Sequence, residues 1–102
     1  MTATDIYLIR QATAADAQAL YELAELDSKA PLSGRILIAE VGDHVVAAIS
    51  VADQRLIADP FERTALVTPV LRTRARAWLH AERVPSLRDR IRALASTARV
   101  SA

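Results

Sequence analysis

The chain has 102 residues, the size of one domain, and its formal net charge at pH 7 is +1. Apolar residues make up 52% of it, but 21 of them are alanine, a composition typical of a GC-rich genome, so the residues able to fill a core are fewer than that percentage indicates. The lack of cysteine excludes disulfides, thiolate metal sites and cysteine nucleophiles. Apolar runs are too short for a membrane span and the first residues lack a signal-peptide pattern, so we expect one cytoplasmic domain over residues 1–102.

Charge divides the chain into two parts. Residues 1–60 carry four basic and nine acidic residues, a net charge of −5, whereas residues 61–102 carry nine basic and three acidic residues, a net charge of +6. Such asymmetry indicates either an anionic partner at the C-terminal end or attraction between the two parts, within one fold or across a dimer. The second interpretation is favoured, because the domain as a whole is not strongly basic.

The N-terminal part opens with a predicted strand and helix. Residues 6–9 are wholly apolar, which is typical of a strand covered on both sides. A helix then begins at Thr13, where Asp16 three residues later completes a capping-box-like pair, and it ends near residues 27–28, before Pro31. The apolar stripe of this helix is Ala17, Leu20, Leu23 and Ala24.

Three short antiparallel strands are predicted next, over residues 35–41, 44–52 and 55–58. The first two are rich in β-branched residues and flank a two-residue hairpin turn whose glycine tolerates a positive φ. The turns along this meander are Gly42–Asp43, Asp53–Gln54 and Asp59–Pro60.

The spacing of apolar residues and the basic charge of residues 61–102 predict a basic helical segment. Its first helix begins either at Thr64 or, more simply, with Thr68 as the cap and Pro69 as the first helical residue, because proline lacks an amide to donate. This helix runs to about Arg83, and a second basic helix follows the break at Pro85.

Arg74 stands in the middle of an apolar face of the first of these helices. A charge in such a position must be paired or reach water. Arg74 therefore either holds an anion or a partner's carboxylate at an interface or packs its stem and extends its head to the domain edge, and the second reading is favoured. The apolar residues of this face are Val67, Val70, Leu71, Ala77, Trp78 and Ala81, and the candidate interface residues are Val67, Leu71, Arg74 and Trp78.

Two lines of arginines follow the predicted helices. Such lines can track phosphates or lie on an anionic membrane. The lack of aromatic platforms, and of a large apolar anchor other than Trp78, favours a solvated face instead. The candidate anion-facing residues are Arg72, Arg76, Arg83, Arg88 and Arg92.

Enzyme signals are few. His44 and His80 have no second histidine or carboxylate at the helical metal-site spacing, which favours surface roles and predicts no metal. Asp53 and Asp59 bracket the last strand and could do acid–base work, but aspartates in turns usually make local hydrogen bonds. The sequence contains neither a Gly-x-Ser-x-Gly elbow nor a phosphate-binding loop, so no catalytic residue is predicted.

Two stretches resemble one known family. Ile9-Arg10-Gln11-Ala12-Thr13 followed by Asp16-Ala17, with Leu20 and Leu23, resembles the opening of GNAT-family acetyltransferases. The hairpin from Leu37 to Ala47 is similar to the second and third strands of that family. The resemblance spans roughly residues 6–58 and implies the fold of the N-terminal half of such an enzyme.

The resemblance fails at the position where the family binds acetyl-CoA. Its members hold the pyrophosphate on backbone amides of a glycine-bearing loop after the fourth strand. The matching stretch here, residues 59–65, has no glycine, Pro60 lacks an amide, and Asp59 and Glu62 repel phosphate. The resemblance therefore implies the fold without the activity, and we predict no cofactor.

These observations predict an α+β fold. We expect a small antiparallel sheet of about four strands, in the order β-α-β-β-β over residues 5–60, packed by the N-terminal helix and the two C-terminal helices. The open sheet predicts a homodimer closed by two-fold symmetry. The expected function is that of a non-catalytic, GNAT-like interaction or regulatory protein. The alternatives are a degenerate acyl-CoA-binding protein completed by dimerisation and a basic-helix module for nucleic acid or anionic membrane.

Overall fold

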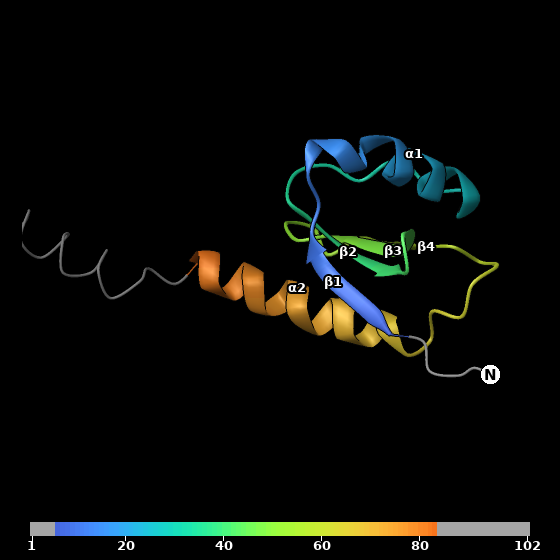
Figure 1. Ribbon diagram of the computed structural model, residues 1–102. Coiled ribbons are helices and arrows are strands. Elements are labelled where there is room, and N and C mark those ends of the chain that lie inside the picture. Colours follow the sequence, from blue (N-terminus) through green and yellow to red (C-terminus); the bar gives the residue numbers. More distant parts are fainter. Residues whose placement is uncertain (1–5, 84–102) are drawn as a thin grey trace, which may run out of the picture.

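The computed structural model describes residues 6–83, which form a four-stranded antiparallel sheet with a helix on each face (Figure 1). The predicted α+β class and the predicted element order are confirmed. The second C-terminal helix, with Arg88 and Arg92, lies outside the described residues. The elements are β1 (Tyr7–Gln11), a short 3-10 turn η1 (Ala14–Asp16), α1 (Ala17–Leu26), β2 (Ile36–Val41), β3 (His44–Ser50), β4 (Leu56–Ala58) and α2 (Val67–Arg83).

The sheet has the order β1-β2-β3-β4, and every neighbouring pair is antiparallel. Alternation along β2 divides the core between the two faces of the sheet. Ile36 and Ile38 contact the α1 side, whereas Leu37 and Ala39 contact the α2 side. Two separate apolar layers therefore hold the helices to the sheet.

The β2–β3 hairpin turns as predicted. Gly42 has a φ of +62°, the left-handed conformation that a tight hairpin turn requires and that glycine adopts without strain. Further along, the register of β3 shifts by one residue opposite Ala39 and Glu40, so Val46 is an extra, bulged residue. Val46 and Ala47 both contact the α2 side of the core as a result.

Strand β1 differs from the prediction that it is covered on both sides. It is an outer strand, and α1 packs mainly over β3 and β4. The α1 side of β1 is consequently left open, and the side chain of Leu8 is 56% exposed. Tyr7 and Ile9, which point to the other side, pack against the core beneath α2.

Helix α2 begins at Val67, between the two predicted starts. The amides of Val67 and Thr68 both donate to the carbonyl of Thr64, at 3.1 and 2.9 Å. Pro69 falls within the first turn, where a residue's amide has no partner inside the helix, so the missing donor costs nothing.

The face of α2 that packs on the sheet is rotated from the predicted one. Its buried residues recur every four positions: Val67, Leu71 and Ala75, continued by the partly buried Leu79. Arg74 lies on the exposed flank beside this row and not within the packed face, and it forms no ion pair with any of residues 6–83. The other predicted members of that face that are exposed are Val70, Ala77, Trp78 and Ala81.

Candidate functional site

Two clusters of charged side chains lie on the sheet, and the first joins β1, η1 and β2. The Arg10 guanidinium donates from Nη1 and Nη2 to the two oxygens of Asp16, at 2.9 and 2.8 Å. Its Nε donates to Glu40 Oε1 at 2.7 Å. The backbone amide of Thr13 adds a 2.6 Å bond to Asp16. One cation thus satisfies two carboxylates, which leaves this cluster closed to a ligand.

The contacts of Asp16 shift its proton affinity strongly. Hydrogen bonds from the Arg10 side chain, and next from the Thr13 amide, hold the pKa of Asp16 well below its usual range. Hydrogen bonds to Asp16, and next to Glu40, raise the pKa of Arg10 further. Both groups are therefore charged at every physiological pH, as a structural ion pair requires. The predicted capping pair of Thr13 and Asp16 is part of this cluster.

The second cluster contains His44, Asp59 and Glu62, each of which offers a potential metal-ligand atom. The three atoms lie within 4.8 Å of one another. His44 Nε2 and Asp59 Oδ2 are 3.6 Å apart, with the imidazole 61% exposed and the carboxylate 7% exposed. No arginine or lysine of residues 6–83 forms an ion pair with either carboxylate of this group.

The local backbone positions Asp59 for this arrangement. Its amide donates to the Val46 carbonyl at 2.9 Å, which extends the β3–β4 pairing by one residue beyond Ala58. Its Oδ1 accepts a 2.8 Å bond from the Phe61 amide, the local turn bond expected of an aspartate before proline. Oδ2 is left to face His44, at the start of the neighbouring strand. The amide of Glu62 donates to the Asp59 carbonyl at 3.2 Å. This turn brings the Glu62 carboxylate close to that of Asp59 and to the His44 imidazole.

Among the cavities lined by residues 6–83, two contain members of this cluster. His44 lines one of about 270 Å³ together with Glu22 and Asp43. Glu62 lines another of about 300 Å³ together with Tyr7 and Phe61. One exposed member of the cluster therefore lines each cavity.

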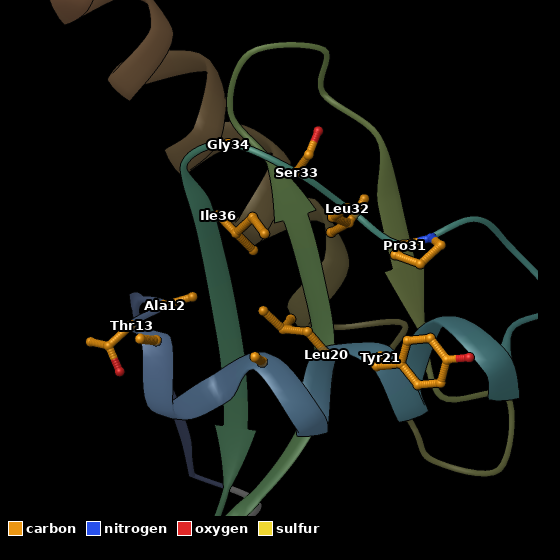
Figure 2. Close-up of a pocket in the computed structure, with 11 residues that line it drawn as sticks. Ala12, Thr13, Leu20, Tyr21, Pro31, Leu32, Ser33, Gly34 and Ile36 are labelled. Atoms are coloured by element: carbon orange, nitrogen blue, oxygen red, sulfur yellow. The ribbon is translucent and has the colours of Figure 1, made fainter.

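A further cavity of about 460 Å³ lies between α1 and the segment before β2. Figure 2 shows Tyr21 and Pro31 at one end and Ala12 and Thr13 at the other. Its lining contains no acidic, basic or imidazole side chain. It offers shape and apolar surface but no group for acid–base or metal chemistry.

The predicted interface residues separate into two groups. Val67 and Leu71 are buried in the core, where they hold α2 to the sheet and cannot reach a partner. Arg74 and Trp78 are exposed. The guanidinium carbon of Arg35, a residue just before β2, lies over the Trp78 ring at 5.4 Å from the ring centre.

The predicted anion-facing arginines divide in a similar way. Arg72 and Arg76 are exposed on α2, four residues apart. Arg83 ends the helix, and the remaining two lie outside the described residues. His80 is exposed on α2, as predicted for a surface histidine.

The sequence interpretation missed the pairing of His44 with Asp59. It looked for ligands at helical spacing and paired Asp59 with Asp53, which lies at the other end of β4. The useful signal was the hairpin register: when β4 pairs antiparallel with β3, the residue after β4 falls beside the start of β3.

Comparison with protein-family models, with curated proteins and with solved structures yields no match for this chain. Within residues 6–83, neither helix is long and apolar enough to cross a membrane.

Proposed function

We propose that the chain is a non-catalytic, GNAT-like interaction protein that acts as a homodimer joined along strand β1. The observation that carries the proposal is the outer edge of β1, with which none of residues 6–83 pairs. Proteins usually protect such an edge with proline, lysine or a bulge. Strand β1 has no proline, lysine or bulge, and its one charged side chain, Arg10, is held by Asp16 and Glu40 within the same chain. Ile6 and Leu8 beside the edge are 79% and 56% exposed.

The backbone of β1 presents hydrogen-bond donors to that edge. The Ala12 amide donates to the Ile36 carbonyl at 2.8 Å, so Ala12 and every second residue before it point toward β2. The amides of Ile9 and Gln11 point the other way, outward from the sheet. The Gln11 carbonyl accepts a 3.3 Å bond from Arg10, which occupies one of its two lone pairs. A partner strand therefore finds donors and acceptors on β1 at regular spacing.

A second copy of this chain is the partner that fits. A two-fold axis at Ile9 sets β1 antiparallel to its own copy and joins the two sheets into one. In this register Leu8 of each copy lies opposite Arg10 of the other, on the face that α1 leaves open, and the Arg10 stem covers apolar surface of Leu8. The same axis sets the Tyr7 end of one sheet beside the Gln11 end of the other.

The charges at these two ends are complementary. The Tyr7 end pairs with Val41, close to the acidic side chains of Asp43, Asp59 and Glu62. The Gln11 end lies near Arg35, which precedes β2. An Arg35–Glu82 ion pair of 2.9 Å joins this residue to the last turns of α2. Such a dimer would bring the carboxylates near the Tyr7 end of one chain toward Arg35 and the exposed arginines of α2 in the other.

The segment between β4 and α2 supports a non-catalytic role. The amides of Phe61 and Glu62 donate to Asp59, and those of Val67 and Thr68 donate to Thr64. These four donors are unavailable to a pyrophosphate, and two carboxylates stand beside them. Acyl-CoA binding, and binding of nucleic acid or anionic membrane by the exposed arginines, remain the alternatives, which a thermal shift with acetyl-CoA and salt-dependent retention on DNA or vesicles would reveal.

Substitution of Gln11 with proline tests the dimer directly. Gln11→Pro removes an outward amide of an outer strand, a position where proline is tolerated, and leaves the β1–β2 bonds intact. We expect a dimer for the wild type and a monomer for Gln11→Pro by size-exclusion chromatography with light scattering. Gln11→Ala is the matched control, since it removes the same side chain but keeps the amide, and it should remain a dimer. A monomeric wild type, or a folded Gln11→Pro variant that is still a dimer, would overturn the proposal.

A further inference from the structure

We propose that His44, Asp59 and Glu62 form a binding site for a divalent transition-metal ion of the zinc class. Its ligands come from β3 and from the turn after β4 and not from β1, so Gln11→Pro, which changes the far end of β1, should bind zinc as the wild type does and keeps the two tests distinguishable. Imidazole nitrogen and carboxylate oxygen are both zinc ligands, and three protein ligands leave a position for water or another ligand. The proposal rests on the separation of the ligand atoms, on the way Asp59 is held and on the charge around the cluster.

The separation of His44 Nε2 from Asp59 Oδ2 fits a metal better than it fits a hydrogen bond. At 3.6 Å the two atoms are beyond ordinary hydrogen-bond distance. Two ligands that each lie about 2.05 Å from a tetrahedral zinc are about 3.4 Å apart. The Glu62 carboxylate lies within 4.8 Å of both atoms, and its exposed side chain can close the remaining distance by rotation.

Asp59 is oriented before any ion binds. The residue is 5% exposed, and its Oδ1 is held by the Phe61 amide at 2.8 Å. Its Oδ2 accepts no hydrogen bond from any residue in 6–83 and points at His44. Oδ2 keeps some access to solvent, since no fully buried side-chain oxygen of residues 6–83 lacks a partner, and an ion can therefore reach it. A hydrogen bond from the backbone to the non-ligating oxygen is the kind of second contact that orients metal ligands.

The surroundings favour a cation. Asp43 and Glu22 line the cavity beside His44, which has no arginine or lysine in its lining. Arg63 lines the cavity beside Glu62 but forms no ion pair with Glu62 or Asp59, so carboxylates outnumber cations around the cluster. One nitrogen and two carboxylates provide fewer oxygens than calcium requires, and the nitrogen is a ligand that magnesium seldom takes. Zinc is therefore the ion that the donor set fits best.

The composition of the chain supplies matched control residues for the zinc-binding test. It has two histidines and no cysteine, so His80 is a matched control for His44, and Asp53 is a matched control for Asp59 at the other end of β4. Untagged protein, freed of metal with a chelator, would be titrated with zinc chloride by calorimetry. We expect one saturable site in the wild type, in His80→Ala and in Asp53→Asn.

The ligand variants should lose this site. His44→Ala, Asp59→Asn and Glu62→Gln should each weaken zinc binding by at least about tenfold, since even loss of an outer contact costs that much. Circular dichroism would show whether each variant folds. His44 and Glu62 are exposed, so their variants should fold and can test the site even if Asp59→Asn does not fold. Excess calcium or magnesium should not displace the zinc. No saturable zinc binding by the wild type, equal binding by His44→Ala and His80→Ala, or displacement by calcium would overturn the proposal.

Discussion

The Arg10–Asp16–Glu40 and His44–Asp59–Glu62 clusters have similar parts and opposite properties. Each has two carboxylates and one nitrogen base, and each joins a strand to a turn. In the first, the guanidinium donates three bonds of 2.7–2.9 Å to its carboxylates. In the second, the imidazole stands 3.6 Å from the nearer carboxylate, and the third member is exposed.

The difference shows what distinguishes a structural ion pair from a candidate ligand site. Arginine is always charged and its planar fork satisfies carboxylates fully, so the first cluster needs nothing from solution. Histidine supplies one nitrogen and a conditional charge, so the second cluster keeps an excess of negative charge beside open cavities. Three predictions test this contrast, from the largest expected effect to the smallest.

Asp16→Asn should destabilise the fold most. It removes a bidentate charged contact and weakens the bond to the Thr13 amide, and hydrogen bonds to charged groups contribute about 1.5–3 kcal/mol each. We expect the free energy of unfolding, measured in urea, to fall by roughly 2–3 kcal/mol. The control is Glu25→Gln, an exposed α1 residue, which should change it by less than about 0.5 kcal/mol. Equal free energies of unfolding for the two variants would show that the Arg10–Asp16–Glu40 cluster does not stabilise the fold.

Acid should erase the difference between wild type and Asp16→Asn. The folded-state pKa of Asp16 lies below its unfolded value, so its contribution is complete above the unfolded pKa of about 4. The contribution declines as pH falls from there toward the folded pKa. The gap in unfolding free energy should therefore be constant from pH 7 to pH 5 and narrow below about pH 4. A gap that is unchanged at pH 3 would contradict the role assigned to the Asp16 charge.

His44→Arg should make the second cluster resemble the first. A permanent cation beside Asp59 and Glu62 replaces the metal, so zinc binding should disappear while the fold is retained. Because the site is partly exposed, stability should change little, with a gain of at most about 1 kcal/mol. Thermal melts with and without zinc measure both effects. A zinc-dependent rise in Tm that survives in His44→Arg would mean that the ion binds elsewhere.

Local sequence signals predicted most of the fold. Gly42 between two β-branched runs predicted the hairpin, and the spacing of Leu20, Leu23 and Ala24 predicted the helix on one face of the sheet. Each signal acts over a few residues and needs no knowledge of the rest of the chain.

The packed face of α2 and the His44 cluster depend on tertiary contacts instead. The apolar residues of α2 cover more than one face, so Val67, Leu71 and Ala75 could be chosen over Val70 and Trp78 only by the shape of the sheet. The contact of His44 with Asp59 crosses 15 residues and depends on the β3–β4 register and on the bulge at Val46. Neither is encoded in the spacing of the residues themselves.

The most direct measurement is anomalous diffraction at the zinc absorption edge from crystals of the untagged protein grown with zinc. One strong anomalous peak within about 2.0–2.2 Å of His44 Nε2 and Asp59 Oδ2, with Glu62 turned toward it, is the predicted result. A peak at His80, or no ordered peak between His44 and Asp59, would contradict the account, and the second cluster would then be an exposed ion pair.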